Sequence, residues 1–203
     1  MTDFRIALTF DAEHPSRSQC PPGVCEGILE TLSSAGVSAT FFLQGRWASA
    51  YPALARAIAD RGHLVGSHSH SHVPMPDLSE TGLASDIEKA ETVIRQVTGV
   101  DPRPWFRCPF GLGRDDAHVL AALQAHGYRH VDWNVSGSDW EDERTSADVY
   151  RQITERSLLH GDGAIVLLHT WPAPTAAALP DIIERLCAEN ARFVSVAELD
   201  RGA

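Results

Sequence analysis

Short apolar runs alternate with longer amphipathic stretches throughout the 203 residues, and this alternation limits the chain to few folds. Seven runs have the length and composition of buried strands. The predicted strands cover residues 4–10, 37–43, 63–67, 104–107, 129–135, 163–169 and 192–196; the predicted helices cover 23–36, 50–62, 79–99, 115–127, 146–161 and 177–190. Alternating strands and helices predict an α/β fold with a parallel sheet, either open or closed into a barrel.

Two architectures fit this pattern, a reduced barrel and a doubly wound sheet. Seven units in 203 residues are few for the standard eight-unit barrel. A dinucleotide-binding fold is disfavoured, because the first strand leads into DAEHPSR rather than G-x-G-x-x-G. We see no linker, low-complexity segment or repeat, and therefore expect one domain over residues 1–203.

Composition narrows the classes of partner and compartment. The net charge of −10 argues against nucleic acid, whose phosphates need a basic surface. No apolar run approaches the roughly 20 residues of a membrane span.

The first residues show no signal-peptide pattern, which predicts a cytoplasmic protein, or a secreted one if an export segment is missing from this sequence. Cys20 and Cys25 flank PPGV, and we expect thiols there in a reducing compartment. Nothing indicates the oligomeric state.

Polar residues with catalytic or metal-binding chemistry follow five of the predicted strands. They are Asp11 and Glu13, the segment 68–72, Arg107, Asp139, and His169. The carboxyl ends of parallel strands meet at one edge of a sheet or one face of a barrel, where sites of α/β proteins form. The sequence therefore predicts a site assembled from these strand ends.

The segment GSHSHSHVP places three histidines at alternate positions. An extended backbone would put all three on one face, whereas a helical turn would put His68 and His72 on one face and point His70 away. Pro74 favours an extended Val73, so any such turn is short. Two imidazoles one turn apart suit a transition metal such as zinc. The alternative is a histidine-rich surface loop.

Five motifs occur in order: LTFDAE, HSHSH, RCPFG, SGSDW and LLHT. Together they resemble the motifs of the polysaccharide deacetylase family, the NodB-homology domain of carbohydrate esterase family 4. The resemblance covers about residues 7–170. It implies a distorted (β/α)7 barrel, which agrees with the seven units counted above.

The resemblance implies a metal held by two histidines and a carboxylate. The ligands from the second motif are His68 and His72, while His70 is not a ligand. The first motif of the family usually reads T-F-D-D, and its second Asp is a ligand. This chain has Ala12 there, so we expect Glu13 to replace it; His14 is a lesser candidate, and the alternative is a missing third ligand. Zinc is the expected ion, with cobalt or another divalent ion possible.

The other motifs imply the catalytic and substrate-binding groups. Asp11 is the implied base that takes a proton from water, and Arg107 is expected to pair with it. His169 is the implied general acid, oriented by Asp139. Among the substrate-binding residues, the backbone N–H of Phe110 donates to the oxyanion, and Pro109 belongs to the same motif. Trp140 and Leu168 line the pocket for the acetyl group.

The implied activity is metal-dependent removal of N-acetyl groups from N-acetylglucosamine units, in chito-oligosaccharides or peptidoglycan fragments. Two alternatives stay open. One is an amidohydrolase for a small non-sugar amide. The other is a catalytically silent metal- or glycan-binding domain, which Ala12 motivates and the set of acid–base residues disfavours.

Overall fold

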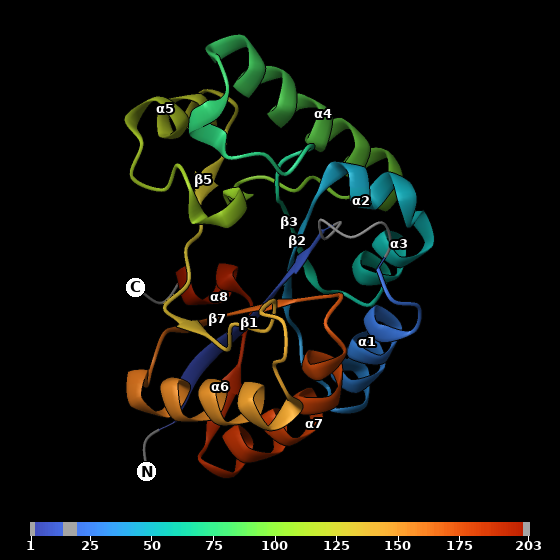
Figure 1. Cartoon of the computed structure of the whole chain (residues 1–203), viewed down its shortest axis with the longest axis vertical. Helices are drawn as coiled ribbons and strands as arrows, with labels where there is room; N and C mark the ends of the chain where they lie inside the picture. The colour runs from blue at the N-terminus through green and yellow to red at the C-terminus, as the bar shows by residue number, and fades with distance from the viewer. Residues whose placement is uncertain (1–2, 14–19, 201–203) are drawn as a thin grey trace. The chain divides into compact units, whose positions relative to one another are not determined.

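The computed structural model describes residues 3–13 and 20–200, which divide into two units (Figure 1). Unit 1 comprises Met1–Asp11, Pro15–Thr40 and Trp133–Ala203. Unit 2 comprises Ala12–His14 and Phe41–Asp132. Each unit contains parallel strands and the helices that pack against them.

Unit 1 is built around the first strand of the chain. Its strands are β1 (Phe4–Ala12), β6 (Val135–Ser136), β7 (Ala164–His169) and β8 (Ala191–Phe193), and its helices are α1 (Val24–Ser34), α6 (Ser146–His160), α7 (Ala173–Ala188) and α8 (Val196–Asp200). β7 lies between β6 and β1 and is parallel to both, and β8 pairs with β1. The last seven residues of β1 are buried, as expected for a parallel strand covered on both faces. The register places Asp11 beside His169.

Helix α7 begins earlier than the sequence predicts. We expected a helix over 177–190, but α7 starts at Ala173, directly after Pro172. A proline in the first turn sacrifices no intrahelical hydrogen bond, so Pro174 is compatible with this start. The early turn carries Thr175 into the interior of unit 1, where it is fully buried. In Figure 1, α6 and α7 lie side by side, as their contacts confirm.

Unit 2 holds the remaining strands and the longest helix among the described residues. Its strands are β2 (Thr40–Leu43), β3 (Leu64–Ser67), β4 (Trp105–Phe106) and β5 (Arg129–His130). Its helices are α2 (Gly45–Ala50), α3 (Pro52–Asp60), α4 (Glu80–Thr98) and α5 (Ala117–Ala125), with two 3₁₀ turns, η1 (Met75–Asp77) and η2 (Pro109–Gly111). β4 lies between β3 and β5, and all three are parallel. His68 and Arg107 therefore follow adjacent strand ends.

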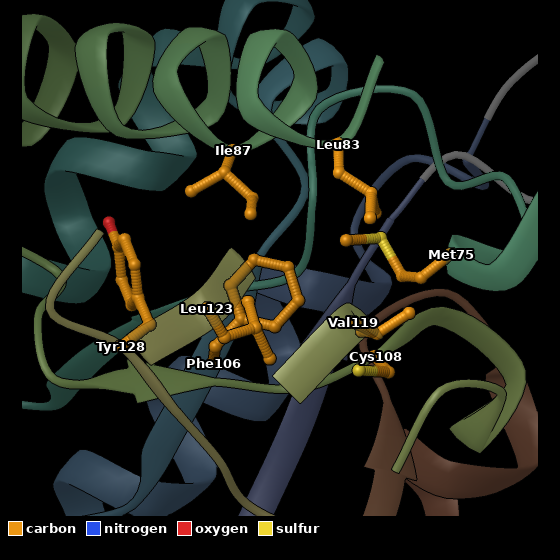
Figure 2. Close-up of a cluster of buried hydrophobic side chains, with 8 residues drawn as sticks. All are labelled: Met75, Leu83, Ile87, Phe106, Cys108, Val119, Leu123 and Tyr128. Atoms are coloured by element: carbon orange, nitrogen blue, oxygen red, sulfur yellow. The ribbon is translucent and has the colours of Figure 1, made fainter. Parts of the chain in front are cut away.

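A cluster of buried side chains forms the part of the core of unit 2 that α4 and α5 cover (Figure 2). Its members are Met75, Leu83, Ile87, Phe106, Cys108, Val119, Leu123 and Tyr128. Figure 2 shows Leu83 and Ile87 pointing from α4 into the cluster. Leu83, Ile87, Ala90 and Ile94 recur at the spacing of one helix face, which explains why α4 is predictable from sequence.

Three further elements differ from the predictions. The helix α2 was not predicted. The predicted strand 129–135 is two short strands, β5 and β6, because the intervening carbonyls of Val131 and Asp132 accept hydrogen bonds from Arg107. The predicted strand 192–196 ends at Phe193, and Ser195 instead caps α8, with its amide and hydroxyl both donating to Glu198.

Within residues 3–13 and 20–200, no helix combines the length and the apolar character that a membrane crossing requires.

The cluster in Figure 2 predicts a large difference between two leucines of α5. Leu123 is 1% exposed and Leu120 is 37% exposed. Leu123→Ala should lower the free energy of unfolding by about 2–5 kcal/mol, because it leaves a cavity in the cluster. The matched Leu120→Ala change should cost about 1 kcal/mol or less. Urea titration of both variants measures the difference; equal losses would mean that Leu123 is not a core residue.

His63 predicts a pH dependence of stability. Burial, together with the charge of Arg61, lowers the pKa of His63 from 6.5 to about 4. Between pH 4 and pH 6.5, the unfolded chain therefore binds more protons at His63 than the folded chain does. The stability is therefore fully present above pH 6.5 and falls as the pH is lowered towards 4, by at most about 1.4 kcal/mol per pH unit for this group.

Urea titrations across this range should show a shallower pH dependence in His63→Gln than in the wild type. His118→Gln, which changes an exposed histidine of α5, serves as the control and should keep the wild-type slope. An unchanged slope in His63→Gln would show that His63 is not the group responsible.

Candidate functional site

Three predicted metal ligands converge in unit 2. Glu13, His68 and His72 each direct one ligand atom to a common point. The Nε2 atoms of the two histidines lie 3.2 Å apart, and His68 Nε2 lies 3.3 Å from Glu13 Oε2. His72 Nε2 contacts the same carboxylate oxygen. Glu13 and His68 are buried, and His72 is partly exposed.

This arrangement fits a divalent metal ion. Two ligand atoms bound to zinc at about 2.0–2.1 Å in tetrahedral geometry lie about 3.3 Å apart. The separations of 3.2 and 3.3 Å agree with that spacing. Two imidazoles and one carboxylate also match the ligand set of catalytic zinc sites, which keep a further position for water or substrate. Glu13 therefore occupies the place expected of the third ligand, and Ala12 is buried beside it.

The tautomer of His68 suits a metal ligand. Its Nδ1 lies 2.8 Å from the backbone carbonyl of Arg107, which can only accept a hydrogen bond. Nδ1 therefore carries the proton, and Nε2 presents a lone pair to the convergence point. The short register between β3 and β4, with Ser67 beside Phe106, places this donor and acceptor next to each other.

His70 lies apart from this ligand set, as predicted. Its amide donates to Asp86 of α4 over 2.7 Å. Its ring packs where a Cβ on Gly45 would approach Nδ1 to 2.4 Å. Burial lowers the pKa of His70, with smaller opposing and reinforcing effects from charged neighbours. His14 lies outside the described residues.

Arg107 is fully buried in unit 2. Its Nε donates to the carbonyl of Val131 over 3.2 Å and its Nη2 to that of Asp132 over 3.4 Å. The guanidinium carbon lies 4.2 Å from the ring centroid of Phe42. These contacts fix the side chain at the end of β4. Asp11 belongs to unit 1, and its pairing with Arg107 stays a prediction.

The loop that follows Arg107 contains Pro109 and Phe110. Phe110 has a φ of 58°, an uncommon value for a residue with a Cβ, and its side chain is 61% exposed. Its ring meets the His72 ring edge to face at 4.5 Å. Among residues 3–13 and 20–200, no acceptor is found for its backbone N–H. That N–H is thus available as a donor to a bound oxyanion.

Cys108 contributes to packing rather than to chemistry. It is fully buried in the cluster of Figure 2. Burial, with a smaller effect of Asp132, raises the pKa of its thiol to about 12. The thiolate, which is the nucleophile, is therefore essentially unpopulated near neutral pH. Its amide donates to Nδ1 of His130, whose pKa burial lowers to about 4.

The predicted acid pair is assembled in unit 1. His169 Nδ1 lies 2.8 Å from Asp139 Oδ1, and the backbone N–H of His169 donates to Asp139 Oδ2 over 2.8 Å. Thr175 donates to the same Oδ2 over 2.6 Å. Asp139 thus accepts three hydrogen bonds in a buried setting. Nδ1 of His169 carries a proton, and Nε2 is the ring nitrogen that can exchange one with a substrate.

Aromatic rings flank His169. The ring of Trp140 lies 5.4 Å from the imidazole, edge to face, and that of Trp171 lies 5.9 Å away. Trp140 is 42% exposed, which suits a residue that contacts substrate. Leu168 is fully buried next to His169. Asp11, on the adjacent strand, is 3% exposed.

Sequence reasoning missed two residues that support these groups, Asp86 and Thr175. Asp86 lies on the buried face of α4 beside Leu83 and Ile87, and an acidic residue on an apolar helix face is the signal that could have identified it. Thr175 gave no such signal, because the predicted helix began at residue 177 and therefore left Thr175 outside it.

Comparisons with known proteins agree with these motifs. A family model described as polysaccharide deacetylase matches residues 1–131. The peptidoglycan-N-acetylglucosamine deacetylase PgdA of Listeria monocytogenes is 34% identical over 202 residues, which are 98% of this chain and 39% of that protein. The chitooligosaccharide deacetylase of Azorhizobium caulinodans is 31% identical over 178 residues, 87% of this chain and 79% of that protein. This chain thus spans well under half the length of the Listeria protein.

A solved structure shows the same fold. A family 4 carbohydrate esterase from Streptomyces lividans, in complex with acetate, matches with a TM-score of 0.81 and 29% identity, covering 94% of this chain and 91% of that chain. This likeness confirms the predicted fold class, an α/β fold of the distorted (β/α)7 type. The structural match extends beyond residue 131, where the family-model match ends.

The geometry of the three ligands predicts the effect of changing Glu13. Glu13→Gln should raise the zinc dissociation constant more than about 100-fold, beyond the 10–100-fold typical of residues that only support a ligand. Glu26→Gln, an exposed change in α1, should leave it within twofold. Competition with a chromogenic chelator measures both constants. Wild-type affinity in Glu13→Gln would exclude Glu13 as a ligand and direct the test to His14.

Proposed function

Because this chain belongs to the polysaccharide deacetylase family, carbohydrate esterase family 4, we propose that it hydrolyses N-acetyl groups of N-acetylglucosamine units with the help of a divalent metal ion. Family membership makes the chain a hydrolase of the deacetylase class. The proposed substrates are peptidoglycan fragments and chito-oligosaccharides, the substrates named for its relatives. The proposed ion is zinc, with cobalt as an alternative.

One observation carries this proposal, the convergence of Glu13, His68 and His72. The carboxylate oxygen of Glu13 and the Nε2 atoms of both histidines meet at one point. Two of their separations, 3.2 and 3.3 Å, match the spacing of ligand atoms around zinc. When bound there, a divalent cation polarises the amide carbonyl and lowers the pKa of water. The substitution of Glu for the usual Asp retains the charge and the oxygen donor.

The proposed proton transfers use groups of unit 1. Asp11 accepts a proton from the attacking water, which is general base catalysis. His169 donates a proton from Nε2 to the amide nitrogen as the C–N bond breaks. Asp139 keeps the imidazole oriented and stabilises its protonated form, and Thr175 holds Asp139 in place. The products are acetate and a free amine.

Further residues are proposed to bind the substrate or to orient the catalytic groups. The N–H of Phe110 donates to the oxyanion that develops on the carbonyl oxygen. Trp140 and Leu168 accept the methyl group of the acetyl moiety. Pro109 fixes the start of the 3₁₀ turn that presents the Phe110 amide. Arg107 is proposed to hold Asp11 ionised by a charge-assisted hydrogen bond.

Acetate release tests this function. Zinc- or cobalt-loaded protein is incubated with N-acetylglucosamine oligomers and with peptidoglycan fragments, and acetate is quantified. Asp11→Asn should lower kcat about 10²–10⁴-fold, because it removes the general base. Its zinc affinity should stay within a few-fold of the wild type, since Asp11 is not a proposed ligand. Asp181→Asn, an exposed change in α7, should leave kcat unchanged.

The alternatives give different outcomes. Release of acetate from a small acetanilide but from no sugar would indicate an amidohydrolase for non-sugar amides. Zinc binding without turnover of any amide would indicate a silent metal- or glycan-binding domain. Equal activity of Asp11→Asn and the wild type would exclude Asp11 as the base.

A further inference from the structure

The segment that connects the two histidine ligands has an unusual backbone. Ser69 and His72 have φ values of 61° and 56°, in the left-handed region that residues with a Cβ rarely adopt. Such conformations persist only where the surroundings hold them in place. The direction of the His72 side chain, and hence the position of its Nε2, depends on this backbone.

Backbone hydrogen bonds hold one side of the segment. The His68 amide donates to the carbonyl of Leu43 over 2.9 Å. The first amides of α2 donate back to the segment, that of Gly45 to the carbonyl of Ser69 over 2.9 Å and that of Arg46 to the carbonyl of His70 over 3.2 Å. Within the segment, the His72 amide donates to the Ser69 hydroxyl over 3.0 Å.

Asp86 holds the other side. Its Oδ2 accepts the His70 amide over 2.7 Å, and its Oδ1 accepts the Ser71 amide over 3.0 Å. These are consecutive amides in the middle of the segment. Asp86 is only 6% exposed, although it projects from a helix face that otherwise buries apolar residues. A buried carboxylate is costly unless it is hydrogen-bonded, and here both oxygens accept backbone hydrogen bonds.

Gly45 limits how α2 can approach this segment. A Cβ at position 45 would come within 2.4 Å of His70 Nδ1 and 3.1 Å of Ala90 Cα. Ala90 lies one turn beyond Asp86 on α4. The segment, α2 and α4 are therefore packed closely around His70, and a shift of the segment would disturb all three.

We propose that Asp86 is a positioning residue for the metal centre. It locks residues 70 and 71 so that His68 and His72, on either side, point their Nε2 atoms at one ion. Its effect passes through the backbone of the segment and requires no contact with the ion. This inference rests on the proposed metal-dependent function, but its test does not depend on turnover.

The test compares Asp86→Asn with the wild type. The amide has nearly the same shape, but only its oxygen can accept, so its NH₂ faces a backbone N–H. The zinc dissociation constant, measured by chelator competition on the full chain, should rise about 10–100-fold. Asp86→Glu retains the carboxylate and should fall between Asp86→Asn and the wild type. Glu88→Gln, an exposed change on the same helix, should stay within twofold of the wild type.

Thermal unfolding of the metal-free variants accompanies the titrations. If Asp86→Asn does not stay folded, all titrations are repeated in trimethylamine N-oxide, which favours the folded state. A folded Asp86→Asn with zinc affinity within twofold of the wild type would overturn the inference, because a purely structural role lowers stability alone. Weakened zinc binding together with a wild type that releases no acetate would overturn the proposed activity and leave this inference standing. A wild type that binds neither zinc nor cobalt would overturn both.

Discussion

The hydrogen bond from the His68 ring to the carbonyl of Arg107 determines much of the chemistry available to unit 2. It joins two adjacent strand ends, fixes which imidazole nitrogen is protonated, and thereby decides that the other nitrogen is a donor to a metal. If the bond were absent, His68 could rotate or take the other tautomer. Arg107, which supplies this carbonyl, also has a fully buried side chain, so the geometry of His68 and a buried cation depend on the same residue.

Unit 1 applies the same principle to a different group. Asp139 accepts hydrogen bonds from the ring and from the backbone of His169, so the acid residue is held at two points by one carboxylate. The third bond, from Thr175, comes from the first turn of α7. In both units, an imidazole with a proposed role is held by a partner that accepts a hydrogen bond from its Nδ1. These partners restrict rotamers and tautomers before any ligand arrives, which reduces the cost of organising the site on binding.

The elements that sequence reasoning located well are those whose pattern is local. The apolar run of β1 and the periodic face of α4 are read directly from their residues. The pair His68 and His72 was predicted from the likeness of HSHSH to the second motif of the family, not from a local backbone pattern. The segment between them is no helical turn, because Ser69 and His72 have positive φ values. The break in the predicted strand 129–135 was not recognised, because it depends on a tertiary contact. Arg107 donates to the two carbonyls that a continuous strand would use in the sheet. The role of Asp86 was overlooked because its partners are backbone amides 15 and 16 residues away, although its place on an apolar helix face marked it as unusual.

Ala12 and Glu13 show that a carboxylate expected at one position of the chain can be supplied by the next residue. The strand β1 ends at Ala12, and the next residue, with one more methylene than aspartate, delivers its oxygen to the two histidines. At the position of Ala12 itself, the chain offers no side chain that can bind a metal. One residue later, a carboxylate oxygen lies at the point where the two imidazoles converge. A comparison by sequence position would therefore miss this carboxylate, whereas a comparison of atom positions finds it.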